Sequence, residues 1–143
     1  MIVGSDLDGV LTSVSVRINF KLPWWLFSGL IFVRPNKKVV EILRKEQDIV
    51  IVSARPQKLE GLTKKWLRFY GIPFHNLFCV GNGKGVGQRK LEIINRMGIE
   101  KFIDDDKEIV DFLLQNSVNA HLVQELFQYP STAKGGEERM FFE

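Results

Sequence analysis

The chain has 143 residues, of which 45% are hydrophobic and 26% are charged, and its formal net charge is +3. This length suits one compact domain with a real core, and the composition is typical of a soluble globular protein. Because the lysines and arginines form no dense run, the sequence offers no clear nucleic-acid site.

The single cysteine and the most apolar stretch indicate the cellular compartment in which the protein is expected. Cys79 is the only cysteine, which excludes an internal disulfide framework and suits a reducing environment. The most apolar stretch, residues 22–33, is too short to span a bilayer. We therefore expect a cytoplasmic protein that is not transmembrane.

The first part of the chain predicts strands. "MIVGS" (1–5) is a short apolar run of strand type. Residues 13–20 alternate between apolar and polar side chains, which is the pattern of a half-buried strand. "LIFV" (30–33) has the composition of a second strand that would complete a hairpin with it.

From residue 35 onward, helical patterns alternate with short apolar runs. The spacing of hydrophobic residues predicts helices over 35–46, 57–70, 87–98 and 107–116. Strand-like runs occupy 48–52, 77–80, 101–103 and 119–123. This order predicts an α/β domain with a mainly parallel sheet over residues 1–129, followed by a flexible tail at 130–143.

Polar residues follow several of these strands. In parallel α/β sheets, ligands bind at the carboxyl ends of the strands. Carboxylates that converge there repel one another unless a cation lies between them, and oxygen ligands suit Mg²⁺. The absence of histidine from these positions argues against zinc. The residues at the predicted strand ends are Asp6 and Asp8, then Ser53 and Arg55, then Asp104, Asp105 and Asp106.

This set of residues favours phosphoryl chemistry. A carboxylate beside a phosphate can act as a nucleophile and split hydrolysis into two easier steps. A second carboxylate two residues on can protonate the leaving oxygen and later activate water. A metal ion and a lysine would offset the charge on the transferring phosphoryl group.

Four segments in order resemble the motifs of the haloacid dehalogenase-like (HAD) superfamily, most of whose members are phosphohydrolases. They are "DLDGVLT" (6–12), "IVIVSARP" (49–56), Lys90 and "FIDDDKEIVD" (102–111). The resemblance covers roughly residues 1–123. It implies a three-layer Rossmann-like fold with a β-hairpin flap after the first strand, here a flap and aromatic insert over about 12–34.

The resemblance also implies a role for each matching residue. Asp6 would be the nucleophile and a Mg²⁺ ligand, and Asp8 would be the general acid/base and ligate through its backbone carbonyl. Ser53 would hydrogen-bond the phosphate, and Lys90 would neutralise charge on the nucleophile and the phosphate. The implied function is a Mg²⁺-dependent phosphomonoester hydrolase, a phosphatase that works through an aspartyl-phosphate.

Two assignments within the resemblance leave a choice. Lys84 in "GNGKGVG" competes with Lys90, and we prefer Lys90 because its helix leads straight into "MGIEKFIDDD". Asp105 would be the acidic metal ligand with Asp104 supporting it, a choice that rests on how the paired aspartates are aligned.

Several other residues have structural interpretations. Arg55 either binds substrate or pairs with a carboxylate of the cluster. Asp106 is interpreted as a cap of the helix that follows it. We expect His75 and His121 to be structural, and Cys79 to be an inert buried thiol.

The aromatic residues Trp24, Trp25, Phe27 and Phe32 leave more alternatives open. They would pack against the domain, form a substrate-facing lid, form an interface between copies of the chain, or contact a membrane surface. The alternative function is a non-catalytic HAD-like module that binds a partner through residues 22–33.

The spacing of the motifs bears on the substrate. Too few residues separate Asp8, Ser53 and Lys90 to form a separate cap domain, so the chain resembles a minimal, cap-less member. Such members act on a phosphorylated small molecule or an exposed phosphoester of a larger substrate, or close the site by homo-oligomerisation. Residues 53–77 are similar to the deoxyribonucleotidase branch, which suggests a 5′-nucleotide.

Overall fold

The computed structural model describes residues 1–12, 34–46 and 48–126. The predicted hairpin at 13–33, with its aromatic residues, and the predicted tail at 130–143 lie outside the described residues. The strands are β1 (Ile2–Ser5), β2 (Asp48–Ser53), β3 (Asn76–Cys79), β4 (Lys101–Asp104) and β5 (Ala120–Leu122). The α-helices are α2 (Lys37–Arg44), α3 (Glu60–Phe69), α4 (Val86–Met97) and α5 (Lys107–Gln115).

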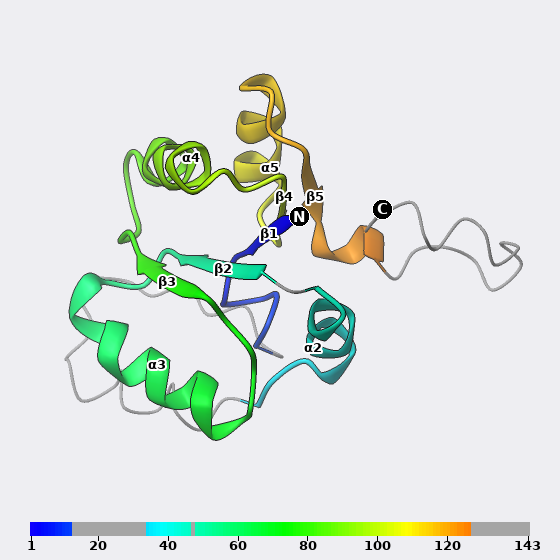
Figure 1. Ribbon diagram of the computed structural model, residues 1–143. Coiled ribbons are helices and arrows are strands. Elements are labelled where there is room, and N and C mark those ends of the chain that lie inside the picture. Colours follow the sequence, from blue (N-terminus) through cyan, green and yellow to red (C-terminus); the bar gives the residue numbers. More distant parts are fainter. Residues whose placement is uncertain (13–33, 47, 127–143) are drawn as a thin grey trace, which may run out of the picture.

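The strands form one parallel sheet in the order β3-β2-β1-β4-β5. β1 lies at the centre, with β2 and β4 on its two sides (Figure 1). All carboxyl ends of a parallel sheet lie at one edge, so the segments that follow β2, β1 and β4 become neighbours. The α/β class and the parallel sheet predicted from the sequence are confirmed.

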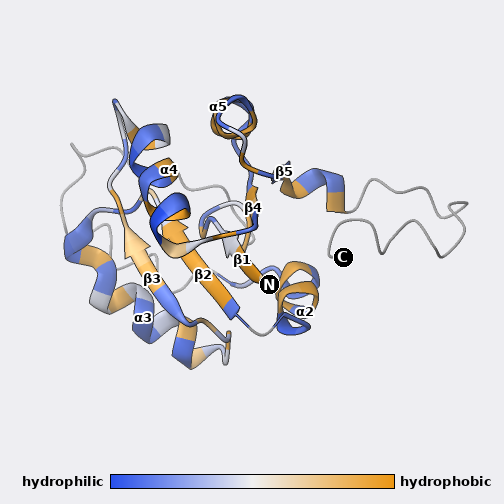
Figure 2. Ribbon diagram, turned by 45° about the horizontal axis from the view of Figure 1, so that its top comes forward, coloured by the Kyte–Doolittle hydropathy of each residue, from blue (hydrophilic) through white to orange (hydrophobic). Residues whose placement is uncertain are grey.

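Helices cover both faces of the sheet, which makes a three-layer, Rossmann-like fold. α2 and α3 lie on one side and α4 and α5 on the other (Figure 1). β2 shows why: Ile49 and Ile51 belong to the core on the α2 and α3 side, and Val50 and Val52 to the opposite core. A strand buried on both faces needs a continuous apolar run, and β2 is strongly hydrophobic between its polar first and last residues (Figure 2).

Within the described residues, the predicted helices and strands agree with the structure to within a few residues. The helix expected at 57–70 opens with a 3₁₀ turn, Gln57–Leu59, before α3 begins. The helix expected at 87–98 ends at Gly98, whose φ of 66° is the left-handed conformation of a helix stop. Among the described residues, no helix is long and apolar enough to cross a membrane.

The ends of the segment that follows β1 meet beside the sheet. Thr12 and Pro35 form an isolated antiparallel bridge, and the N–H of Asn36 donates to the carbonyl of Leu11 at 2.7 Å. The described residues on the two sides of 13–33 are therefore neighbours. This contact lies a few residues beyond Asp6 and Asp8, near the carboxyl end of β1.

Candidate active site

The structure brings three of the predicted carboxylates together. Asp6 follows β1, Asp104 ends β4, and Asp105 comes directly after it. One carboxylate oxygen from each lies within 4.8 Å of the other two. β1 and β4 are hydrogen-bonded neighbours, and the N–H of Asp6 donates to the carbonyl of Ile103 at 2.8 Å, so the sheet itself sets this proximity.

Lys90 supplies a positive charge to this carboxylate cluster, which we define as Asp6, Asp104 and Asp105. From the second turn of α4, its Nζ lies 2.7 Å from Oδ2 of Asp104 and 3.4 Å from Oδ1 of Asp6. Burial would lower the pKa of Lys90, but Asp6 and Asp104 outweigh burial and raise it. Of the two competing lysines, Lys90 is therefore the one beside the carboxylates, while Lys84 is exposed.

The cluster carries more negative than positive charge when no cation is present. Burial raises the pKa of Asp6 well above its ordinary value, and Asp104 raises it further, while Lys90 opposes both effects. Lys90 thus contacts two carboxylates, Asp6 and Asp104, that are largely removed from water, and the half-buried Asp105 adds a third negative charge nearby. This arrangement of oxygen donors fits a hard divalent cation, with Asp6, Asp104 and Asp105 as the residues that could hold it.

Gly9 lets Asp105 approach the start of the chain. Its φ is 80°, and a Cβ built there would collide with the Asp105 carboxylate. Only glycine combines this backbone conformation with such a close approach. The glycine of "DLDG" is therefore needed both for the turn after β1 and for the position of a cluster carboxylate.

Asp106 does not belong to the cluster but caps α5. Its carboxylate accepts the N–H of Glu108 at 2.9 Å, which is the hydrogen bond of an N-cap. Its own N–H donates to Oδ1 of Asp104 at 3.1 Å. The interpretation of Asp106 as a helix cap is confirmed.

Asp8 lies in a separate ion pair. Arg55 donates from Nε to Oδ2 of Asp8 at 2.9 Å and from Nη2 to Oδ1 at 2.7 Å. Of the two interpretations of Arg55, the structure shows pairing with a carboxylate. The Asp8 carboxylate accordingly contributes no oxygen to the cluster.

A turn follows β1 directly. The strand ends at Ser5, as the apolar run over residues 1–5 predicts. The carbonyl of Leu7 accepts the N–H groups of Leu11 at 2.8 Å and Thr12 at 3.0 Å, which forms this turn. Leu7 is fully buried in the core.

Ser53 ends β2 and is fully buried. Its Oγ accepts the N–H of Arg55 at 3.1 Å, and a hydroxyl that accepts one hydrogen bond can still donate its proton. Its carbonyl accepts the N–H of Val80 at 2.8 Å, which ties it to the loop after β3. Ser53 thus occupies the strand-end position at which the sequence predicts it.

Two residues that sequence reasoning missed organise the site. Thr63 accepts a hydrogen bond from Nη1 of Arg55 at 3.1 Å. A polar residue within the buried stripe of α3 was the available signal. Arg89 is the second: its guanidinium binds four carbonyls of the glycine-rich loop, those of Val80, Gly81, Asn82 and Lys84.

The histidines and the cysteine lie outside the cluster. His75 donates its backbone N–H to the carbonyl of Ile49, and His121 pairs with Glu125 at 3.6 Å. Burial, with a smaller contribution from Glu60, raises the pKa of Cys79 to about 12. At neutral pH the thiol is therefore protonated and a poor nucleophile, as expected of an inert thiol, although Cys79 is half-buried and not buried as expected.

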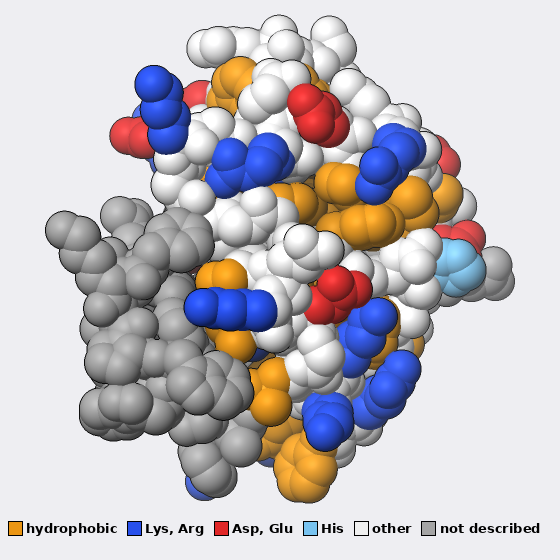
Figure 3. Space-filling view, turned by 90° about the vertical axis from the view of Figure 1, so that its left-hand side faces the viewer, with side chains coloured by type: hydrophobic (Ala, Val, Ile, Leu, Met, Phe, Trp, Pro, Cys, Tyr) orange, Lys and Arg blue, Asp and Glu red, His pale blue; other side chains and the backbone are white. Residues whose placement is uncertain are grey.

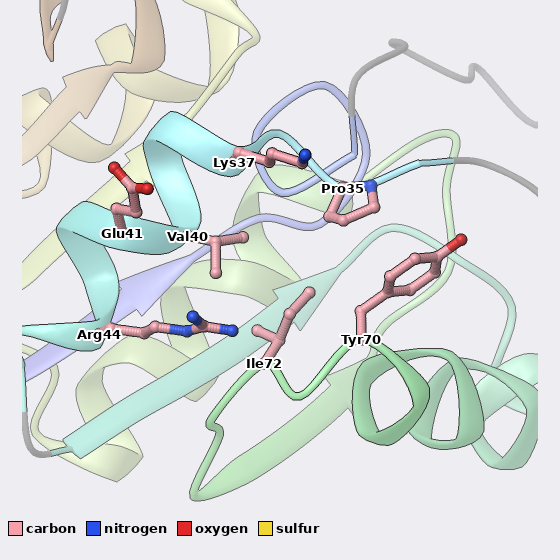
Figure 4. A pocket seen from close by; sticks show the side chains of 7 residues that line it. All are labelled: Pro35, Lys37, Val40, Glu41, Arg44, Tyr70 and Ile72. Atoms are coloured by element: carbon pink, nitrogen blue, oxygen red, sulfur yellow. The ribbon is translucent and has the colours of Figure 1, made fainter.

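A pocket of about 250 Å³ lies elsewhere, between α2 and the end of α3. Val40, Glu41 and Arg44 line it from α2, and Tyr70 and Ile72 line it from the other side (Figure 4). None of its lining residues belongs to the carboxylate cluster. On the face that carries α3 and β3, the lysines and arginines of the described residues are scattered among hydrophobic side chains (Figure 3).

The fold and the cluster together define an α/β, Rossmann-like domain with an acidic, lysine-containing site at the carboxyl edge of its sheet. No family model matches the chain. A curated protein of Halalkalibacterium halodurans, "Putative nucleotidase BH1399", is 28% identical over 93 residues. That match covers 65% of this chain and 40% of the relative.

Two solved structures share the fold. One, "Structure of the Pnkp1/Rnl/Hen1 RNA repair complex", matches with a TM-score of 0.66 and 21% identity, over 85% of this chain and 41% of that one. The other, "Structure of Pnkp1/Rnl/Hen1 complex", has a TM-score of 0.68 and 20% identity, over 85% and 44%. The chain thus spans less than half the length of each of these proteins.

Proposed function

We propose that this chain is a HAD-like phosphomonoester hydrolase that depends on Mg²⁺ and works through an aspartyl-phosphate on Asp6. The observation that carries the proposal is the contact of buried Lys90 with both Asp6 and Asp104 at the edge where the carboxylates meet. The similarity to a nucleotidase supports a hydrolase of this kind and makes a 5′-nucleotide a reasonable substrate.

Asp6 is the proposed nucleophile. Its carboxylate oxygen attacks phosphorus, and the bond from phosphorus to the leaving oxygen breaks. Lys90 offsets negative charge on Asp6 and on the phosphoryl group, and Ser53 donates its hydroxyl proton to a phosphate oxygen. Burial and Asp104 raise the pKa of Asp6, and the charge of Lys90 opposes this and favours the ionised carboxylate that attacks.

Asp8 is the proposed proton carrier. It donates a proton to the leaving oxygen and then takes one from the water that attacks the phosphoenzyme, which releases phosphate and restores Asp6. Its placement two residues after the nucleophile, yet outside the cluster, keeps the two carboxylates in different environments.

The cation has a place in the same cluster. Asp6 and Asp105, with Asp104 in support, and the backbone carbonyl of Asp8 would hold Mg²⁺. When bound, the ion would neutralise charge on the transferring phosphoryl group.

Hydrolysis of p-nitrophenyl phosphate by the purified chain tests the proposal. We expect release of nitrophenol that requires Mg²⁺ and is lost in Asp6→Asn. Asp111→Asn is the matched control, because Asp111 is exposed on α5 and this change should leave the rate unchanged. Equal rates for the wild type and Asp6→Asn would overturn the proposed function.

A further inference from the structure

Arg55 connects four parts of the site. Its guanidinium binds both carboxylate oxygens of Asp8, and its side chain is 3% exposed. Its backbone N–H donates to Oγ of Ser53, and its carbonyl accepts the N–H of Gly81 at 3.1 Å. One residue therefore links the turn after β1, the end of β2, α3 and the glycine-rich loop.

Thr63 fixes the guanidinium from the side away from Asp8. Its hydroxyl donates to the carbonyl of Leu59 at 2.8 Å, which leaves its oxygen to accept from Nη1 of Arg55. Thr63 is fully buried, so water does not compete for these bonds. Three nitrogens of the planar guanidinium thus donate to fixed partners, and the group has little freedom to rotate.

The fixed guanidinium sets the orientation of the Asp8 carboxylate. A paired carboxylate offers about four lone-pair directions, and the two bonds from Arg55 use two of them. The remaining directions are those in which Asp8 can hold a proton for transfer. A carboxylate free to rotate would instead present its proton in many orientations, which weakens proton transfer in the transition state.

We propose that Arg55 is a positioning residue that orients Asp8 for proton donation to the leaving oxygen. This inference rests on the proposed function, because Asp8 needs an ester to act on. It follows that Arg55 matters most for esters whose leaving group departs as a strongly basic alkoxide. An ester with a weakly basic leaving group needs little proton transfer and should depend little on Arg55.

The test compares two esters of similar size, benzyl phosphate and p-nitrophenyl phosphate. Arg55→Lys keeps a positive charge but loses the planar, bidentate fork. For this variant we expect kcat/KM to fall about 100-fold for benzyl phosphate and less than about tenfold for p-nitrophenyl phosphate. We compare kcat/KM because it reports the step in which the leaving group departs.

Two further variants make the result specific. Thr63→Val removes the acceptor of the hydrogen bond from Nη1 of Arg55 and leaves Asp8 unchanged. It should therefore shift the ratio of the two kcat/KM values in the same direction as Arg55→Lys, by a smaller factor. In an Asp8→Asn background, Arg55→Lys should leave that ratio unchanged, since the carboxylate it orients is gone.

Each outcome has a distinct meaning. An equal loss for both esters in Arg55→Lys, or a change of ratio that persists in the Asp8→Asn background, overturns the positioning role and leaves the proposed function intact. If the wild type hydrolyses neither ester, the proposed function fails and this inference fails with it. If Arg55→Lys does not fold, Thr63→Val carries the test, and an unchanged ratio overturns the inference.

Discussion

The ammonium nitrogen of Lys90 lies 2.7 Å from Oδ2 of Asp104, and both side chains are 2% exposed or less. A charge pair this deeply buried is costly to break, because the remaining partner keeps its charge without water or a counterion. The same lysine reaches Asp6, so it links the nucleophile proposed here to the acidic end of β4. The stability and the proposed chemistry of the site therefore share one residue.

Replacement of this lysine should affect stability and turnover together. We expect Lys90→Met to lower the free energy of unfolding by about 3–5 kcal/mol and to abolish phosphatase activity. Urea unfolding and the rate with p-nitrophenyl phosphate measure the two effects. Lys84→Met is the matched control: Lys84 is exposed, so both quantities should stay near those of the wild type. A larger loss of activity in Lys84→Met would reverse the assignment of the two lysines.

Mg²⁺ should stabilise the folded chain through the carboxylate cluster. An ion that binds only the folded state adds about 2.7 kcal/mol at a concentration 100 times its Kd, so thermal unfolding should shift upward. Asp105→Asn removes one of the clustered negative charges and should reduce that shift.

Asp106→Asn is the control for this measurement. It alters the N-cap of α5, and asparagine caps nearly as well as aspartate, so the basal melting temperature should change little and the Mg²⁺ shift should persist. An equal Mg²⁺ shift in the wild type and in Asp105→Asn would show that the ion binds elsewhere.

Stability without divalent cations should depend on pH through Asp6. Its pKa is raised by burial and by Asp104, so the folded chain holds this proton more tightly than the unfolded chain does. The resulting stabilisation is complete below the ordinary value of 3.8 and is lost as the pH rises through the higher folded pKa. Asp6→Asn stays neutral and should lack this decline.

The pH dependence is measured by urea unfolding between pH 4 and pH 8 in the presence of a chelator. At neutral pH, Asp6→Asn should unfold at a higher urea concentration than the wild type. The difference should shrink toward pH 4. Parallel pH profiles for the two proteins would contradict the buried, charge-crowded state of Asp6.

Gly9 should be intolerant of even one extra carbon. Gly9→Ala would push a methyl group into the Asp105 carboxylate and impose a strained backbone at a φ of 80°. We expect weaker Mg²⁺ binding and a lower rate, measured by titration of activity with Mg²⁺.

Gly61→Ala tests the same change where space is available. No atom lies within 4 Å of a Cβ placed there, and Gly61 lies in α3, where alanine should stabilise by about 0.5–1 kcal/mol. Normal Mg²⁺ binding in Gly9→Ala would contradict the close approach of Asp105.

The sequence was sufficient for the fold because its patterns are local. The continuous run of β2 and the helical spacing of α3 each reveal burial within a few residues, and strand–helix alternation then dictates a parallel sheet. The choice of Lys90 over Lys84 also depended on a local feature, the helix that leads into β4. Boundaries were less accurate: the helix predicted from residue 57 opens with a 3₁₀ turn, and α3 itself begins at Glu60.

The pairs within the site were harder to foresee. Asp8 and Arg55 are 47 residues apart, and the pattern alone allowed Arg55 to face a substrate as well as a carboxylate. Thr63 fits the helical pattern of α3, and that pattern does not reveal that its hydroxyl accepts a hydrogen bond from the same guanidinium. Such contacts depend on how α3 packs against the end of β2, which hydrophobic spacing does not specify.

The most direct test of the account is to trap the phosphoenzyme. Enzyme in excess over a phosphomonoester is quenched in acid during one turnover with Mg²⁺, and borohydride then reduces any acyl phosphate to an alcohol that marks the residue in mass spectrometry. We predict that residue 6 is marked in the wild type only when ester and Mg²⁺ are both present. Release of phosphate with no mark at residue 6, or a mark on Asp105 instead, would contradict Asp6 as the nucleophile.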